Sequence, residues 1–136
     1  MKSSIIKAIS LLFAVFSLTS CDTPKSLTNK GDKFSEKSLY ADACQFYMQA
    51  LNQKGDFIEA KEGLRASGQK QINIYLDNFF KSKNFGEERK AIYHYRDASS
   101  LQSKIATYSI QVDIPQTYTS DYNTLVDNYV VANYDK

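Results

Sequence analysis

The sequence predicts an all-α protein made of antiparallel helical hairpins. After the first 23 residues, apolar side chains recur at intervals of three and four residues through most of the chain, which is the period of one helix face. The motif Ala-x3-Tyr-x2-Ala occurs twice, and the apolar–polar alternation typical of a strand is confined to residues 110–115. With 136 residues, 43% of them hydrophobic and 24% charged, the chain has the composition of one globular domain.

The first 20 residues have the layout of a secretory signal peptide. Lys2 and Lys7 precede an uncharged apolar run at residues 8–18, and small polar residues follow it. A helix of this length spans roughly half of the ~30 Å hydrocarbon thickness of a bilayer, so the run is too short for a permanent transmembrane helix. We therefore expect a targeting segment.

The end of this segment, Leu18-Thr19-Ser20-Cys21, resembles the lipobox of bacterial lipoproteins. The resemblance implies cleavage before Cys21, a diacylglycerol on its sulfur, and often acylation of the freed amine, for example with palmitate. Two or three acyl chains give stable anchoring. We expect residues 1–20 to be a cleaved signal peptide, residues 21–26 a lipidated tether, and residues 27–136 a helical domain. The alternative is an ordinary signal peptide whose cleavage site precedes a cysteine.

Two helices are predicted on either side of a break at residues 35–38. Thr23 and Pro24 favour a helix start, because threonine can cap the first free N–H groups and proline supplies the φ of the first turn. Lys54 and Gly55 end the second helix. The apolar faces comprise Leu27, Gly31 and Phe34 in the first helix, and Leu39, Ala43, Phe46, Tyr47, Ala50 and Leu51 in the second.

A third helix is predicted over residues 57–83. Asp56 and Glu59 have the spacing of a capping box at its start. Gly63 and Gly68 lie inside it, and each weakens a helix by about 1 kcal/mol relative to alanine.

The rest of the chain is predicted to hold two more helices. A turn at residues 84–86 leads to a fourth helix over residues 87–108. Residues 110–115 are expected to form an extended loop, because no partner strand is visible and Pro115 would stop a strand. Ser120 is expected to cap the last helix, which carries Tyr122, Leu125, Val126, Tyr129 and Val130 at helical spacing.

An internal repeat organises these helices. Ala43, Tyr47 and Ala50 recur as Ala91, Tyr95 and Ala98 after 48 residues, and a short polar turn precedes each copy's helix. A small alanine lets a partner helix approach closely, and an aromatic ring one turn later fills the space between neighbouring hairpins. We therefore expect both sets to pack between helices.

The first copy resembles the tetratricopeptide repeat. The residues that carry the resemblance have that family's spacing: Leu27, Gly31, Phe34, Tyr40, Ala43, Tyr47 and Ala50. Leu27 stands where the family's first aromatic residue is usual, and Gly55 replaces the closing proline. The resemblance covers residues 24–55 and is partial over residues 57–108, where both helices are longer than in the family. The alternative is an irregular antiparallel bundle.

Few residues could carry chemistry. His94 has no cysteine or carboxylate at metal-ligand spacing, and Cys44 would be left without a partner cysteine. Glu87 and Glu88 lie in the first turn of a predicted helix, where negative charge complements the helix dipole. There is no phosphate-binding loop and no catalytic serine motif. The sequence therefore predicts no enzyme, no cofactor and no metal site.

Charge also argues against nucleic acid as a partner. The chain has 17 basic and 15 acidic residues, and loss of Lys2 and Lys7 leaves 15 − 15 = 0. A neutral chain without basic runs has no electrostatic footprint for nucleic acid.

We expect an interaction module that holds another envelope protein or a peptide at a membrane of the bacterial envelope, with the outer membrane favoured. The expected interaction face comprises Asn29, Lys30, Lys33 and Lys37. The alternative is a structural envelope lipoprotein that forms a bundle or oligomer without a groove. Tyrosines are frequent near the C-terminus, and they serve either a binding surface or the core: Tyr118, Tyr122, Tyr129 and Tyr134.

Overall fold

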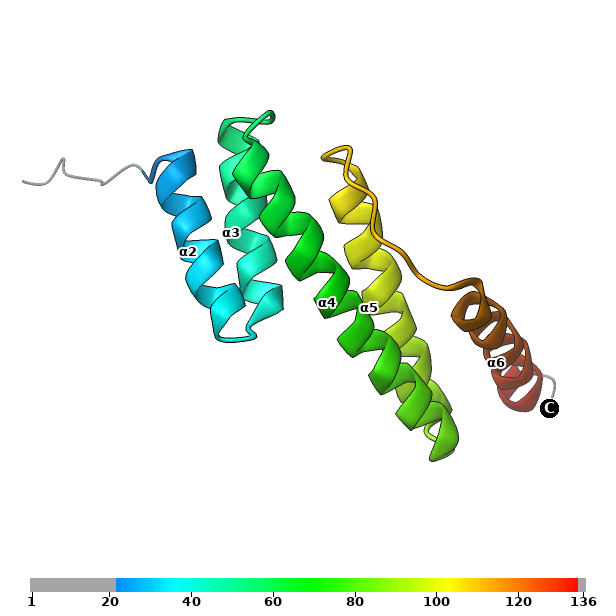
Figure 1. Cartoon of the computed structure of the whole chain (residues 1–136). Coiled ribbons are helices and arrows are strands. Elements are labelled where there is room, and N and C mark those ends of the chain that lie inside the picture. Colours follow the sequence, from blue (N-terminus) through cyan, green and yellow to red (C-terminus); the bar gives the residue numbers. More distant parts are fainter. Residues whose placement is uncertain (1–21, 135–136) are drawn as a thin grey trace, which may run out of the picture.

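The computed structural model describes residues 22–134, and these residues form helices and connecting segments without a strand (Figure 1). The helices are α2 (Pro24–Glu36), α3 (Tyr40–Gln53), α4 (Ile58–Asn84), α5 (Glu88–Ala106) and α6 (Gln116–Tyr134). The all-α prediction is confirmed, and residues 110–115 are extended as expected. None of the described helices is both long and apolar enough to cross a bilayer.

Helix α2 begins as the sequence predicts. The Thr23 side chain accepts a hydrogen bond from the Ser26 N–H at 3.1 Å, and Pro24 is the first helical residue. The helix therefore already includes residues 24–26, which were expected in the tether. At the other end the chain turns through Ser38, whose φ is 60°.

Two predicted helix caps are wrong. The residue before α4 is Phe57, which makes no side-chain cap hydrogen bond, and Asp56 lies in the preceding turn, where the Phe57 N–H bonds to the Lys54 carbonyl. Helix α6 starts at Gln116 instead of Ser120, because the Pro115 carbonyl already accepts a hydrogen bond from the Tyr118 N–H at 3.0 Å. Pro115 thus ends the extended segment and opens the helix at the same point.

The helices stack as two antiparallel hairpins. Helices α2 and α3 form the first hairpin and α4 and α5 the second, and α4 packs against both α3 and α2 (Figure 1). Helix α6 packs mainly against α5. Each hairpin therefore packs against the helix that follows it in the chain, the first hairpin against α4 and the second against α6.

The Tyr47 ring lies between helices of both hairpins. A Cβ atom added at Gly31 of α2 would come within 2.6 Å of this ring, and one added at Gly63 of α4 would also collide with it. The Tyr47 hydroxyl donates a hydrogen bond to Asp32 Oδ1 at 2.7 Å, and only 2% of the residue is exposed. Two glycines thus give the ring its space, one on each flanking helix.

Tyr95 has the corresponding position in the second hairpin. Its ring lies 5.8 Å from the ring of Phe79 on α4 and stacks on Tyr122 of α6 at 4.1 Å between centroids. Its hydroxyl donates to Thr119 Oγ1 at 2.9 Å. Both tyrosines of the repeat therefore lie between their own hairpin and the next helix, and all four alanines of the repeat are fully buried: Ala43, Ala50, Ala91 and Ala98.

Two other residues of the tetratricopeptide-like pattern lie nearer the surface. Phe34 stacks on Phe46 at 5.1 Å between ring centroids, which joins α2 to α3. Tyr40 is half-buried at the start of α3, and the Lys70 ammonium lies 5.0 Å from its ring centroid. These contacts join α2 to α3 and α3 to α4 near the surface.

The interior comprises two adjoining apolar cores. The first core lies mainly between α2, α3 and the start of α4, and the second between the rest of α4, α5 and α6. Leu101 and Val112 pack against both. Ile105 and Ile110 come late in the chain but are buried in the first core.

Replacing Gly63 with alanine should destabilise the protein by about 1–2 kcal/mol, although alanine is the better helix former by about 1 kcal/mol. The added methyl group would displace the Tyr47 ring, which its hydrogen bond to Asp32 holds in place. Urea unfolding of the mature chain carrying Cys21→Ser measures the change.

Gly55→Ala is the matched control, because a Cβ atom there would meet nothing closer than 3.8 Å. It should be neutral or slightly stabilising. A Gly63→Ala protein as stable as the parent would show that the ring does not need the space that glycine leaves.

Candidate functional site

The predicted interaction face lies on one exposed side of α2. Asn29, Lys33 and Lys37 are exposed, opposite the side of the helix that is buried against α3 and α4. Lys30 is half-buried and pairs with the Asp22 carboxylate at 2.7 Å. The four side chains therefore form a polar stripe on a convex helix surface, and their binding role stays a prediction.

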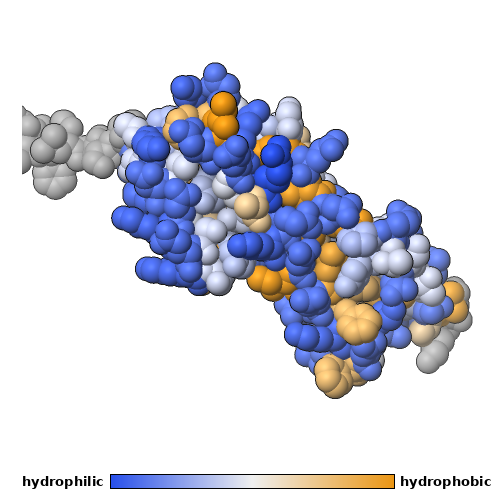
Figure 2. All heavy atoms as spheres, in the orientation of Figure 1, coloured by the Kyte–Doolittle hydropathy of each residue, from blue (hydrophilic) through white to orange (hydrophobic). Residues whose placement is uncertain are grey.

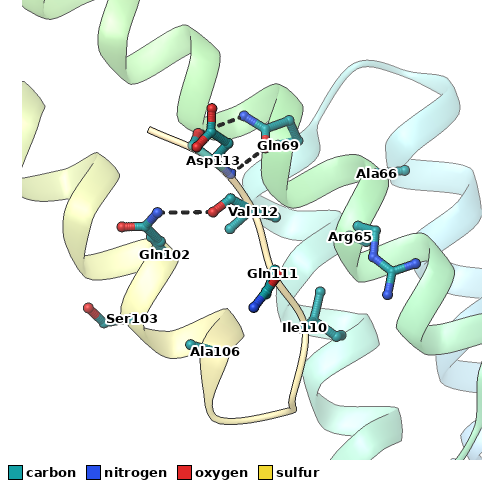
Figure 3. A pocket seen from close by; sticks show the side chains of 10 residues that line it. All are labelled: Arg65, Ala66, Gln69, Gln102, Ser103, Ala106, Ile110, Gln111, Val112 and Asp113. Atoms are coloured by element: carbon teal, nitrogen blue, oxygen red, sulfur yellow. Dashed lines mark hydrogen bonds between the residues drawn. The ribbon is translucent and has the colours of Figure 1, made fainter. Parts of the chain in front are cut away.

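A surface cavity of about 800 Å³ lies elsewhere, between α4, α5 and the extended chain that follows α5 (Figure 3). Helix α4 contributes Gln69 and α5 contributes Gln102, and residues 110–113 run between them. We call residues 110–114 the strap. The strap forms one wall of this cavity.

Two glutamine side chains hold the strap through its main chain. Gln69 Oε1 accepts from the Asp113 N–H at 2.7 Å, and Gln69 Nε2 donates to the Asp113 carbonyl at 2.9 Å. Gln102 Nε2 donates to the Val112 carbonyl at 2.9 Å (Figure 3). The Gln69 amide thus binds one residue through both of its main-chain polar groups, as a neighbouring strand would.

Side chains of the strap enter the apolar cores. Ile110 is 1% exposed, and Val112 and Ile114 are half-buried against the second core. Helix α6 continues this cover, because Tyr118 lies 6.0 Å from Phe79 and Asp121 pairs with Lys83 of α4. The chain's own C-terminal part therefore covers this side of the second hairpin.

A second hollow, of about 300 Å³, lies between α5 and α6. We call it the α5–α6 cleft, and it is lined by Arg89, Ile92, Tyr93, Arg96, Val126, Tyr129 and Val130. Neither arginine pairs with a carboxylate of residues 22–134, although Arg96 Nε donates to the Tyr122 hydroxyl at 3.2 Å. Arginine and tyrosine are enriched at the energetically important positions of protein interfaces.

Exposed apolar side chains lie close to this cleft. Tyr93 and Val130 are themselves exposed, and Phe85, at the turn before α5, is 81% exposed. Arg89 and Tyr129 also line an adjoining hollow of about 330 Å³, together with residues 86–88. Figure 2 shows apolar atoms gathered over the lower ends of α4 and α5, whereas the surface over α2 is mostly hydrophilic.

No sequence pattern indicates the glutamine contacts or the role of the two arginines. Gln69 and its partner Asp113 are 44 residues apart, so no local pattern could join them. Arg89 and Arg96 are exposed positions on an amphipathic helix, and their significance depends on where α6 packs. The C-terminal tyrosines are predicted to serve either the core or a binding surface. Tyr122 stacks on Tyr95 against the second core, while Tyr129 lines the cleft.

The candidate chemical groups lie apart from one another. His94 is half-buried on α5, and Cys44 is buried on α3. Glu87 precedes α5 and accepts from Lys90 Nζ at 2.6 Å. Within the part of the chain that the structure describes, no three His, Cys, Asp or Glu residues are grouped as metal ligands.

Cys21, the predicted lipid attachment site, lies outside the described residues. Comparison of the chain with models of known protein families, with curated proteins and with solved structures found no match. Inference about function therefore depends on the residues themselves.

Replacing Gln69 with alanine should cost about 1–2 kcal/mol, because it removes both hydrogen bonds to Asp113. The Asp113 amide should also exchange with deuterium faster, which hydrogen exchange resolved by residue measures. Gln111→Ala is the control, because Gln111 is an exposed residue of the same cavity. Equal protection of Asp113 in both variants would contradict the proposed role of Gln69.

Cys44 should be unreactive in the folded protein. Burial raises the pKa of its thiol to about 12, so only roughly one molecule in ten thousand carries the reactive thiolate at pH 8. In a Cys21→Ser chain, a disulfide reagent should modify Cys44 only after urea unfolds the protein. Modification of the native protein at the rate of a free thiol would show that Cys44 is accessible.

Proposed function

We propose that this protein is a lipid-anchored lipoprotein of the bacterial envelope that binds a protein or peptide partner through its helical domain. The observation that carries the binding role is the α5–α6 cleft, where arginines, tyrosines and aliphatic side chains occur together. Such a surface combines aromatic, aliphatic and charged side chains, as the central parts of protein interfaces do.

The lipid anchor is supported by the sequence alone. A basic start, a short apolar run and Leu18-Thr19-Ser20-Cys21 occur in the order that a lipoprotein precursor requires. The described domain is compatible with this attachment, because its first helix begins only three residues after Cys21.

Residues 22–134 offer no paired catalytic groups that would support turnover. The nucleophile and the base that a hydrolase needs are not adjacent, since Cys44 is buried in the first core and His94 lies on the second hairpin. A binding role without catalysis fits these surfaces better.

The second candidate is a structural lipoprotein that associates with copies of itself. One observation favours it: the protein's own strap and α6 pack against the second hairpin. In this case the exposed apolar residues near the cleft would serve self-association.

Photo-crosslinking in the native membrane distinguishes these proposals. A photoreactive phenylalanine at Tyr93 should capture a partner of different mass, whereas the same group at the exposed Gln49 of α3 should not. Capture of a partner only by a photoreactive group at Lys33 would show that the interface is the polar stripe of α2. Capture only of a second copy at Tyr93 would support the structural candidate, and failure at every position would contradict both.

A further inference from the structure

Asp22, the first described residue, is fixed to the domain by three contacts. Its carboxylate accepts hydrogen bonds from Lys30 Nζ at 2.7 Å and from Ser26 Oγ at 3.2 Å. Its main-chain carbonyl accepts from Gln53 Nε2 of α3 at 2.9 Å. Lys30 lowers the pKa of the Asp22 carboxyl, so the carboxylate keeps its charge at neutral pH.

These contacts leave little length between Cys21 and the folded domain. Consecutive Cα atoms are about 3.8 Å apart, and Thr23 already caps α2. The headgroup region on each side of a bilayer is roughly 5–8 Å thick. A lipid on Cys21 would therefore hold Asp22 within the headgroup layer.

We infer that one end of the helical stack, comprising residues 22–25 and 53–58, lies against the lipid headgroups in a fixed orientation. We call it the anchor end, and the inference rests on the proposed lipid anchor. The start of α2 and the turn between α3 and α4 lie at this end together (Figure 1), and the hydrogen bond from Gln53 to Asp22 joins them.

The surface of the anchor end suits a headgroup layer. Ile58 is 66% exposed, and Lys54 lies with its ammonium 5.6 Å from the Phe57 ring centroid. Lys25 and Lys54 are exposed, but so are Asp56 and Glu59. Because these charges balance, the contact depends on the acyl chains, and the domain without them should not bind vesicles.

The same orientation directs the opposite end of α4 away from the membrane. This helix has 27 residues and spans about 40 Å from Ile58 to Asn84. Phe85 follows it directly, and the α5–α6 cleft adjoins the same turn. The lipid surface is thus the partner of one end, and the cleft is presented at the other.

Fluorescence quenching in vesicles tests this orientation. The full-length acylated protein is prepared as two variants, Ile58→Cys and Phe85→Cys, and each is labelled with an environment-sensitive fluorophore. Cys44 is buried and should stay unlabelled, which is checked by treating the parent protein with the same fluorophore. The vesicles contain phosphatidylcholine with a nitroxide on its headgroup. The label at residue 58 should be quenched at least twofold more than the label at residue 85.

A spacer variant is the matched control. Ten glycine and serine residues inserted between Cys21 and Asp22 reach about 17 Å on average and should abolish the difference between the two labels. Mass spectrometry of the same preparations reports the acyl chains. Equal quenching in an acylated protein without the spacer would overturn the orientation and leave the anchor intact, whereas the absence of acyl chains would overturn both.

Discussion

The Tyr47 ring determines how the two hairpins fit together. It fills the volume that Gly31 and Gly63 leave open, so α2, α3 and α4 approach one another at a distance set by one aromatic side chain. Burial and the neighbouring Asp32 carboxylate both raise the pKa of the Tyr47 hydroxyl, which therefore stays protonated as a hydrogen-bond donor. Tyr95 repeats the arrangement one hairpin later, with Phe79 and Tyr122 in place of the glycines.

This arrangement also explains how the stack ends. Helix α6 occupies the place against Tyr95 that α4 occupies against Tyr47. The strap covers the remaining groove of the second hairpin, so its apolar side is not left to solvent. Repeat-like stacks need such terminal covers for solubility. The polar stripe of α2 and the α5–α6 cleft remain open.

The sequence predicted those parts of the fold that depend on local spacing. Helix periodicity located the helices, and the Ala-Tyr-Ala motif identified the buried contacts around Ala43 and Ala91. From the sequence, Gly63 is only a weak point of a helix. Its structural role depends on the Tyr47 ring, which comes from a residue 16 positions earlier in the chain. The sequence predicts Ser120 as the cap of α6, because serine is a good cap in isolation, whereas the helix follows Pro115, five residues earlier, whose carbonyl accepts the first turn's hydrogen bond. The cleft and the glutamine contacts require a packed tertiary structure, so they could not be predicted.

The burial of Ile105 and Ile110 in the first core has a consequence for the order of folding. The first hairpin precedes both residues by more than 50 positions, yet Ile105 covers Gly68 beside the Cys44 sulfur, and Ile110 closes the same interior. When only the first hairpin has been synthesised, the first core therefore still lacks these two side chains. The first core is complete only when the end of α5 and the strap have been synthesised.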